Sequence, residues 1–372
     1  MMNKIYDKNL SVEKDDCSDA VWYDVKNSSF KLYGFADSCD ILSTRIPQRI
    51  AQRVSDGVLA LSTNAAGGRV RFSTNSKKIA LRVQYRNCSG SVKNTAAVNA
   101  GFDLYVSYKE KSEVYLHSYI PYSYDVSENT VEYNYVLEDN LFIYDDINDG
   151  FYNFTLYFPC FSEVRQLYIG IDEGSIVKEG LRYRNEKPIV FYGSSITHGA
   201  CAGRPGNTYE SFLSQKYNID YINLGFAGNA KGEPEMAEYI TDLDMSMFVC
   251  DYDHNTPTIE HLIQTYQRFY QIVRGKNPNI PYVMVSRPNI YLYPEAYRSR
   301  RDFIRDFHNK MKLNGDKNVY FIDGYNLLDG EFAESCTADG CHPNDLGFYR
   351  MANQFGFIFE KIFDRTLFIR NS

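Results

Sequence analysis

The sequence has no long hydrophobic run and no excess of positive charge, and each absence excludes a class of protein. No apolar segment approaches the ~18 residues that a membrane-spanning helix needs. Residues 1–16 are polar and lack the apolar core of a signal peptide. The net charge of −7 argues against a nucleic-acid partner, because binding to phosphates requires a basic face. We therefore expect a cytoplasmic protein with neither a membrane nor a nucleic-acid partner.

The eight cysteines show no paired spacing, so the usual sign of a disulfide framework or a zinc site is missing. They stand at positions 17, 39, 88, 160, 201, 250, 336 and 341. In the absence of a leader sequence, this scatter favours free thiols. Cys336 and Cys341 lie close to Asp339, but zinc would need two further ligands at a recognisable spacing, and none is near in the sequence. We expect no metal and no cofactor.

Helical periodicity is nearly absent from the first half of the chain, where short apolar runs alternate with turn residues. The 372 residues, 44% of them apolar and 23% charged, are enough for two globular domains. The expected strands of the first half are 57–62, 68–72, 79–85, 102–108, 154–158 and 166–171. Many short strands with period-two alternation predict an all-β, jelly-roll-like sandwich over residues 1–180.

From residue 187 onward, strands alternate with amphipathic helices. The expected strands are 189–192, 221–225, 246–250, 282–286 and 319–322, and the expected helices are 209–216, 233–241, 258–274, 295–313 and 345–363. Strand–helix units with short connections predict a parallel five-stranded sheet covered by helices on both faces. We therefore assign residues 185–372 to a second, α/β domain and place the linker at 173–186.

A serine stands at the end of the first strand of this second half. The sequence Gly-Ser-Ser-Ile-Thr at 193–197 follows the apolar run 188–192, so Ser195 is expected at the carboxyl edge of the sheet, where open α/β sheets bind ligands. Asp339 and His342 follow in one short segment near the end of the chain. Together these residues can supply a nucleophile, a general base and a group that orients the base. This layout is typical of hydrolases.

Other side chains near these positions offer alternative roles. Ser194 can replace its neighbour as the nucleophile, and both serines can also be turn or N-cap residues. His198 lies close in sequence and can replace His342 as the base, although it has no obvious carboxylate partner at short range. Cys201 and Cys341 are possible nucleophiles, but each lacks a base of its own.

Four short blocks of the second half resemble those of the SGNH (GDSL-like) hydrolases, a family named for conserved Ser, Gly, Asn and His residues. They are Gly-Ser-Ser-Ile-Thr at 193–197, Asn-Leu-Gly-Phe-Ala-Gly-Asn at 223–229, Asp-Tyr-Asp-His-Asn at 251–255 and Asp-Gly-Cys-His-Pro at 339–343. Ser194 stands where the family usually has Asp, and the third block lacks the usual Gly-x-Asn-Asp pattern. Gly-Phe-Asp-Leu-Tyr at 101–105 resembles the Gly-x-Asp-Leu-Tyr signature of a β-rich domain that precedes one branch of these hydrolases.

The resemblance implies a three-layer α/β/α, flavodoxin-like catalytic domain and a serine esterase with Ser195, Asp339 and His342 as its catalytic residues. The expected substrates are small-molecule or oligosaccharide acyl esters, above all acetyl esters of carbohydrates. One alternative is an acyltransferase that uses the same acyl-enzyme. The other is a carbohydrate-binding protein whose hydrolase domain is inactive.

The resemblance also implies an oxyanion hole, formed by the backbone N–H groups of Ser195 and Gly228 and the side-chain amide of Asn255. Asn229 is the alternative to Asn255 as the side-chain donor. His254 is expected to shape the mouth of the pocket.

Three further features of the sequence can each be interpreted in two ways. Residues 204–207 form either a substrate loop or an ordinary turn. Asp103 and Tyr105 serve in strand packing or in a contact between domains. The 32 tyrosines are better explained by packing and strand propensity than by stacking on sugars.

Overall fold

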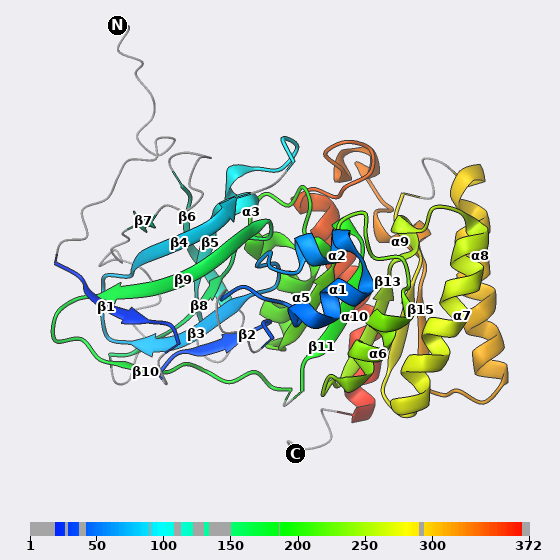
Figure 1. Cartoon of the computed structure of the whole chain (residues 1–372), viewed down its shortest axis with the longest axis horizontal. Helices are drawn as coiled ribbons and strands as arrows, with labels where there is room; N and C mark the ends of the chain where they lie inside the picture. Colours follow the sequence, from blue (N-terminus) through cyan, green and yellow to red (C-terminus); the bar gives the residue numbers. More distant parts are fainter. Residues whose placement is uncertain are drawn as a thin grey trace, which may run out of the picture.

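The computed structural model describes residues 19–26, 29–36, 42–88, 91–107, 113–121, 130–133, 150–185, 187–289 and 294–366. A β-rich half and an α/β half lie side by side along the longest axis of the molecule (Figure 1). Within the described residues, no helix combines the length and the apolar character that crossing a membrane requires.

The β-rich half consists of two antiparallel sheets. One has the strand order β1-β9-β4-β7, with β1 at Val21–Asp24, β9 at Ser162–Ile171, β4 at Ala80–Cys88 and β7 at Thr130–Tyr133. The other has the order β10-β3-β8-β5-β6, with β2 paired to β3. Its strands are β10 (Val177–Glu179), β3 (Arg69–Thr74), β8 (Tyr152–Tyr157), β5 (Phe102–Ser107), β6 (Glu113–Tyr119) and β2 (Lys31–Tyr33).

The inner faces of these two sheets share one hydrophobic core. Phe72 and Leu104 from one sheet pack in the same cluster as Leu81 and Ile169 from the other, and all four side chains are fully buried. Because every second residue of a strand points to the same face, the alternation seen in the sequence places these side chains between the sheets. The predicted β-sandwich is confirmed.

The prediction of a strand at 57–62 is wrong, because this segment is the helix α2 (Asp56–Leu61). The hydroxyl of Ser55 accepts the N–H of Val58 at 3.1 Å and caps the helix. A β-carbon on Gly57 would lie 1.9 Å from the side chain of Asn229, so the apolar run packs closely against the α/β half. The short helices α1 (Gln48–Val54) and α3 (Ala96–Ala100) were also not predicted.

The boundary between the halves is less simple than one linker. β10, at Val177–Glu179, lies inside the predicted linker and pairs with β3 of the sandwich. Ile46, Ala51 and Val58, which precede most of the sandwich strands, pack in the core of the α/β half. The division into residues 1–180 and 185–372 therefore stays a prediction.

The α/β half has a parallel sheet with the strand order β12-β11-β13-β14-β15. Its strands are β11 (Ile189–Gly193), β12 (Tyr221–Gly225), β13 (Met247–Asp251), β14 (Tyr282–Val285) and β15 (Val319–Ile322). Its larger helices are α5 (Tyr209–Tyr217), α6 (Pro234–Asp242), α7 (Ile259–Lys276), α8 (Pro294–Leu313) and α10 (Asp345–Thr366). These elements agree with the expected ones to within a few residues.

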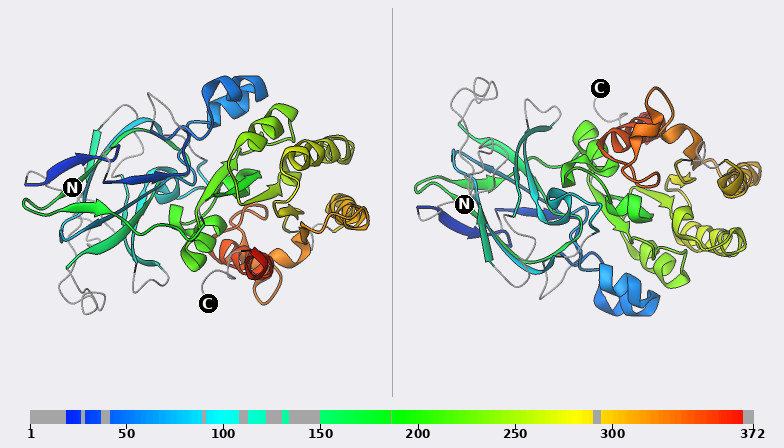
Figure 2. Two further views of the ribbon diagram at one scale, coloured as in Figure 1. Left: turned by 90° about the horizontal axis from the view of Figure 1, so that it is seen from below. Right: turned by 90° about the horizontal axis from the view of Figure 1, so that it is seen from above.

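Helices cover both faces of this sheet (Figure 2). α5 and α10 share one apolar core with one face, and α6, α7 and α8 share a second core with the other. The predicted three-layer α/β/α fold is confirmed. Strand β11 has β12, the next strand in sequence, on one side and β13 on the other, so the order of the strands reverses at β11. Open α/β sheets bind their ligands beyond the carboxyl ends of the strands at such a point.

Buried arginines of the β-rich half tie it to β12. The Arg45 guanidinium donates to the carbonyl oxygens of Gly225 at 2.8 Å and Asn223 at 3.1 Å. Arg69 donates to the Tyr221 carbonyl at 2.9 Å and forms an ion pair with Asp220. The sandwich is therefore fixed directly to the sheet that carries the predicted site.

Candidate active site

Ser195 is the first residue of the short helix α4 (Ser195–His198), which follows the buried strand β11. The hydroxyl of Ser194 accepts the Ile196 N–H at 3.2 Å and caps this helix, so Ser194 takes the N-cap role that the sequence left open. A β-carbon on Gly193 would lie 2.0 Å from the Thr197 hydroxyl, and only glycine permits this turn. The side chain of Ser195 is left partly exposed at the carboxyl edge of the sheet.

The structure brings the three predicted side chains together in a chain of hydrogen bonds. Ser195 Oγ lies 2.9 Å from His342 Nε2. His342 Nδ1 lies 3.0 Å from Asp339 Oδ2. The backbone N–H groups of Cys341 and His342 also donate to Asp339 Oδ1, at 3.1 and 2.8 Å. The tight turn between Asp339 and His342 therefore fixes both side chains relative to each other.

Lys93 is a fourth member of this group, and no motif in the sequence indicated its contact. Its ammonium lies 2.8 Å from Asp339 Oδ2, although the two residues are far apart in the chain. Burial raises the pKa of Asp339, but the His342 N–H, the Lys93 ammonium and the His342 ring together hold it below its usual value. Lys93 lies in a loop of the β-rich half, and the sequence around it shows no motif that predicts this contact. The contact forms only when the tertiary fold brings the two segments together.

The rest of the Lys93 loop also contacts the segment that follows α4. The Asn94 side chain accepts the Cys201 N–H at 3.0 Å, and the Thr95 hydroxyl donates to the Gly203 carbonyl at 2.7 Å. The β-rich half therefore contacts both the segment that follows Ser195 and the segment that carries Asp339.

Gly228 and Asn255 lie on neighbouring loops at the same edge of the sheet. Gly228 is exposed and has a φ of 72°, in the turn that follows β12. Asn255 ends the 3-10 helix η4 (Asp253–Asn255), and its amide donates to the Phe226 carbonyl of that turn at 3.0 Å. The amide of Asn229 instead donates to Ala227 at 2.7 Å within its own turn, and its carbonyl side faces Gly57 of α2.

His198 is occupied elsewhere. Its Nε2 lies 2.9 Å from the Cys160 carbonyl, and its ring stacks on Phe161 with the centroids 4.3 Å apart. Burial, and to a lesser degree the charge of Arg45, lowers its pKa well below the usual value. Its ring therefore packs against the β-rich half as a neutral group, and Ser195 has its imidazole contact with His342.

The two cysteines near the site are held as thiols. Burial raises the pKa of Cys201 to about 11, and burial followed by the charge of Asp339 also raises the pKa of Cys341. A thiolate would be needed for nucleophilic attack. The six cysteines within the described residues, namely Cys88, Cys160, Cys201, Cys250, Cys336 and Cys341, are all free. Cys17 and Cys39 lie outside the described residues.

One group of side chains has the residue types of a metal site. Asp339, Cys341 and His342 place possible ligand atoms within 4.8 Å of one another. The two ring nitrogens of His342, however, already face Asp339 and Ser195. A cation bound there would have to displace one of these contacts.

The Gly-x-Asp-Leu-Tyr segment makes a contact between the two halves. Asp103 is fully buried and accepts the Gly206 N–H at 2.7 Å, with Arg204 at 3.3 Å. The Arg204 guanidinium also donates to the Tyr105 hydroxyl at 2.6 Å and lies 3.8 Å from the centre of the Tyr115 ring. Residues 204–207, which contain the 3-10 helix η3 (Pro205–Asn207), are therefore a docking segment between the halves.

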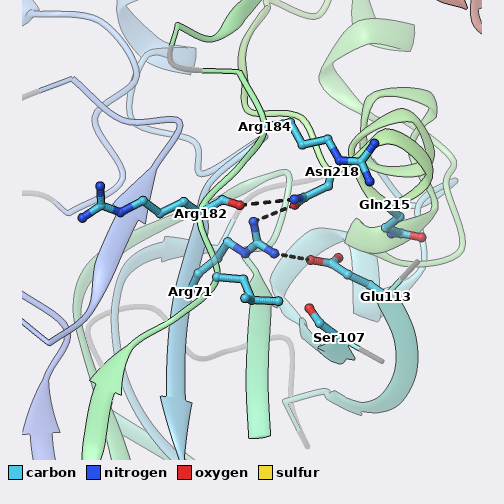
Figure 3. Close-up of a pocket in the computed structure, with 8 residues that line it drawn as sticks. Arg71, Ser107, Glu113, Arg182, Arg184, Gln215 and Asn218 are labelled. Carbon is cyan, nitrogen blue, oxygen red and sulfur yellow. Dashed lines mark hydrogen bonds and ion pairs between the residues drawn. The ribbon is translucent and has the colours of Figure 1, made fainter. Parts of the chain in front are cut away.

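A hollow of about 190 Å³ lies between the halves (Figure 3). Arg71 joins its walls, donating to Asn218 at 2.9 Å and lying 3.7 Å from Glu113. Asn218 stands between α5 and the start of β12, at the amino edge of the parallel sheet. Ser195 follows the carboxyl end of β11, so this hollow is separate from the candidate site.

Each half of the chain matches a known protein family. Residues 186–360 match the GDSL-like Lipase/Acylhydrolase family, and residues 20–177 match the GxDLY family, described as the N-terminus of Esterase_SGNH_hydro-type. A comparison with curated proteins gives no match.

Solved structures resemble the chain over nearly its whole length. A protein of Bacteroides ovatus ATCC 8483 described as a GDSL-like lipase is 27% identical, with a TM-score of 0.80, over 93% of this chain and 98% of that one. The salicylyl-acyltransferase SsfX3 of a tetracycline biosynthetic pathway is 17% identical, with a TM-score of 0.73 and the same coverage. The acetyl xylan esterase Est2A of Butyrivibrio proteoclasticus is 14% identical, with a TM-score of 0.54, over 93% and 99% of the two chains.

The three-layer α/β/α fold is that of the SGNH hydrolase class. At the carboxyl edge of its sheet lie Ser195, His342 and Asp339. The chain belongs to the SGNH (GDSL-like) hydrolases that carry an N-terminal Gly-x-Asp-Leu-Tyr domain, and it is a carboxylic ester hydrolase.

Proposed function

We propose that this protein hydrolyses acyl esters, above all acetyl esters of carbohydrates, through an acyl-enzyme on Ser195. The observation that carries the proposal is the 2.9 Å contact between Ser195 Oγ and His342 Nε2, backed by Asp339 on the other ring nitrogen. A free serine hydroxyl is a poor nucleophile at neutral pH and needs such a base.

The proton follows the line of these contacts. In the neutral ring, Asp339 holds the proton on Nδ1, and Nε2 accepts the hydroxyl proton of Ser195 as its oxygen attacks the ester carbonyl. His342 then gives this proton to the departing alcohol, and water repeats the sequence to release the acid. Asp339 stays ionised and stabilises the imidazolium.

The oxyanion of the tetrahedral intermediate would be met by three donors, from Ser195, Gly228 and Asn255. The N–H of Ser195 lies in the first turn of α4, where no helical carbonyl accepts it. Asn255 uses one amide hydrogen on the Phe226 carbonyl, which keeps its side chain beside the Gly228 turn. Asn229 is turned toward α2, and this favours Asn255 as the side-chain donor.

Two features support a carbohydrate ester as the substrate. The family places a β-rich domain before the hydrolase, and here that domain contributes Lys93 to the wall of the site. Several proteins with this fold are described as carbohydrate esterases, including an acetyl xylan esterase and an esterase in complex with cellohexaose. We expect release of acetate from acetylated oligosaccharides.

Hydrolysis of p-nitrophenyl acetate and labelling by a fluorophosphonate probe test the reaction. Both should disappear in Ser195→Ala and persist in the matched variant Ser194→Ala, which loses only the cap of α4. Activity should survive EDTA and reductant, because the steps above use neither a cation nor a disulfide. Labelling that persists in Ser195→Ala and disappears in Ser194→Ala would identify Ser194 as the nucleophile. If the protein hydrolyses no ester, the result would favour a carbohydrate-binding protein with an inactive hydrolase domain.

An added alcohol distinguishes hydrolysis from acyl transfer. An acyltransferase would give the acceptor ester as its main product, because its pocket admits the alcohol and excludes water. The hydrolase that we propose gives free acetate as the main product in the presence of millimolar sugar.

A further inference from the structure

A second cavity, of about 180 Å³, lies directly beside Asp339. Its walls are formed by residues 339–341 and by His254, Arg287, Asn289 and Tyr297. Arg287 and Asn289 follow β14 at the carboxyl edge of the sheet, the edge that carries Ser195. The cavity therefore lies at the same edge of the sheet as the candidate active site and shares Asp339 with it, whereas the hollow between the two halves lies elsewhere.

Arg287 is a buried cation held in place from several sides. Its backbone N–H donates to Asp253 Oδ2 at 2.9 Å, and its guanidinium lies 3.5 Å from the centre of the Tyr297 ring. Its Nη2 lies 3.1 Å from His254 Nε2. These contacts orient the guanidinium without neutralising its charge.

No carboxylate balances Arg287 at ion-pair distance within the part of the chain that the structure describes. The nearest candidate, Asp253, forms its ion pair with Arg300 at 3.6 Å. The Nε of Arg287, the Oδ1 of Asn289 and the Nδ1 of His254 are buried and have no hydrogen-bond partner among the described residues. Buried polar groups are nearly always paired, so three unpaired groups in the wall of one cavity point to a ligand, and the Arg287 Nε–H is the donor that a carboxylate would accept.

The other charges around the cavity cancel. Asp339 is paired with the Lys93 ammonium at 2.8 Å. Burial, and then the charge of Arg287, holds the pKa of His254 well below its usual value, so this ring is neutral. Arg287 and Arg300 therefore share one carboxylate, Asp253, and one positive charge is left unbalanced beside the cavity.

We propose that Arg287 binds a carboxylate carried by the ester substrate, and that the protein prefers such substrates over neutral ones. The inference rests on the proposed esterase function and deepens it by naming a substrate class. A guanidinium presents two parallel N–H donors that match a carboxylate, and this pairing is strong where water is excluded. The space suits a carboxylate with a few attached atoms.

The carboxylate can belong to the acyl group or to the alcohol, and two pairs of esters distinguish these sources. For the acyl group, 1-naphthyl hydrogen succinate is compared with its neutral methyl ester. For the alcohol, acetylated methyl glucuronoside is compared with acetylated methyl glucoside. The measured quantity is the ratio of kcat/KM within each pair, because size is matched and charge is not.

We expect the wild-type protein to prefer the charged member of one pair by on the order of 10-fold or more, as for a hydrogen bond between charged groups. Arg287→Gln should remove this preference, and Arg287→Lys should keep part of it, since the charge stays and the planar fork is lost. Arg298→Gln, an exposed arginine of α8, is the matched control and should keep the full preference. Thermal denaturation of each variant checks that it folds.

Two results would overturn the inference alone, provided that 1-naphthyl acetate is hydrolysed. One is a wild-type protein without preference in either pair. The other is a preference that Arg287→Gln leaves unchanged, because a purely structural arginine would alter both members equally. If the wild-type protein hydrolyses no ester, the proposed function fails, and the substrate class falls with it.

Discussion

At the scale of single residues, the role of each polar side chain in the candidate site follows from the hydrogen bonds that it already makes. Ser194 and Ser195 are chemically alike, but the first accepts the Ile196 N–H and the second faces His342. The two asparagines near the Gly228 turn differ in the same way. The Asn229 amide donates to a carbonyl of its own turn, whereas the Asn255 amide donates to that turn from the neighbouring helix η4.

This difference gives a prediction for the oxyanion donors. Asn255→Ala should lower kcat by on the order of 100- to 1,000-fold, because it removes a donor to the developing negative charge. Asn229→Ala is the matched control and should change kcat far less. Steady-state kinetics on p-nitrophenyl acetate decides, and the reverse order of effects would assign the role to Asn229.

Lys93 leads to a prediction about pH dependence. Its ammonium lies on the oxygen of Asp339 that faces His342 and is one of the groups that hold the pKa of Asp339 below its usual value. In Lys93→Met, Asp339 gains a proton more easily, and the loss of activity in acid should begin at higher pH by up to about one unit. The shift is limited because the Lys93 side chain is 59% exposed and salt screens it.

The profile of kcat/KM between pH 4 and 9 measures this shift. Raising the salt concentration should move the wild-type profile in the same direction and leave Lys93→Met almost unchanged. A lysine that only supported the fold would lower the rate at every pH without moving the profile.

At the scale of elements, the short helix α4 rests on a buried carboxyl group. Asp251, at the end of β13, accepts hydrogen bonds from Thr197 of α4 at 3.1 Å and Tyr209 of α5 at 3.3 Å. Burial raises the pKa of Asp251 to about 8. The same cause raises the pKa of Glu210, the neighbour of Tyr209. The support under the serine thus contains acids that are neutral in the folded protein.

Stability should therefore fall as the pH rises. The folded protein holds a proton on Asp251 up to about pH 8, whereas in the unfolded chain this carboxyl loses its proton near its ordinary pKa of 3.8. The stabilising contribution is complete below pH ~4 and is lost as the pH rises through about 8. Asp251→Asn should make the free energy of unfolding less dependent on pH, as measured by urea denaturation at pH 5 and 8.5.

The exposed carboxylate Asp306 is the control for this experiment. Asp306→Asn should keep the wild-type dependence on pH, because its side chain is 68% exposed. An equal slope in the wild type and Asp251→Asn would show that Asp251 is ionised in the folded protein.

At the scale of the whole molecule, the two halves are joined into one structural unit. Arg45 and Arg69 reach β12, Arg204 docks onto the Gly-x-Asp-Leu-Tyr strand, and Lys93 reaches Asp339. These contacts are charged and mostly buried. They hold the sandwich in one position relative to the catalytic edge, as a stable part of the site rather than a tethered module.

The buried contact of Asp103 should dominate the stability of this arrangement. Asp103→Ala leaves the Arg204 guanidinium without its carboxylate and should lower the free energy of unfolding by about 3–5 kcal/mol. Asp242→Ala removes an exposed partner of Lys276 and should cost about 0–1 kcal/mol. Chemical denaturation measures both, and equal effects would mean that the docking contact contributes no more than a surface pair.

Much of the α/β half was predictable, because its signals are local. Its strands are short buried apolar runs, and its helices have an apolar stripe, so both periods can be read along the chain. In the β-rich half the signals were weaker. The apolar segment at 57–62 was mistaken for a strand, because its packing against Asn229 and its cap at Ser55 are not visible as a period. The strands β1, β2, β6, β7 and β10 were not predicted either.

The sequence by itself determined the class of fold and the three residues now grouped at the site. Ser195 follows a strand, and Asp339 and His342 share one turn, so chain connectivity and the rule for open sheets suffice. Only the tertiary structure decided what surrounds them. Lys93, Arg287 and Arg204 owe their partners to segments far apart in the chain, and charge contacts of that kind leave no periodic trace in a sequence.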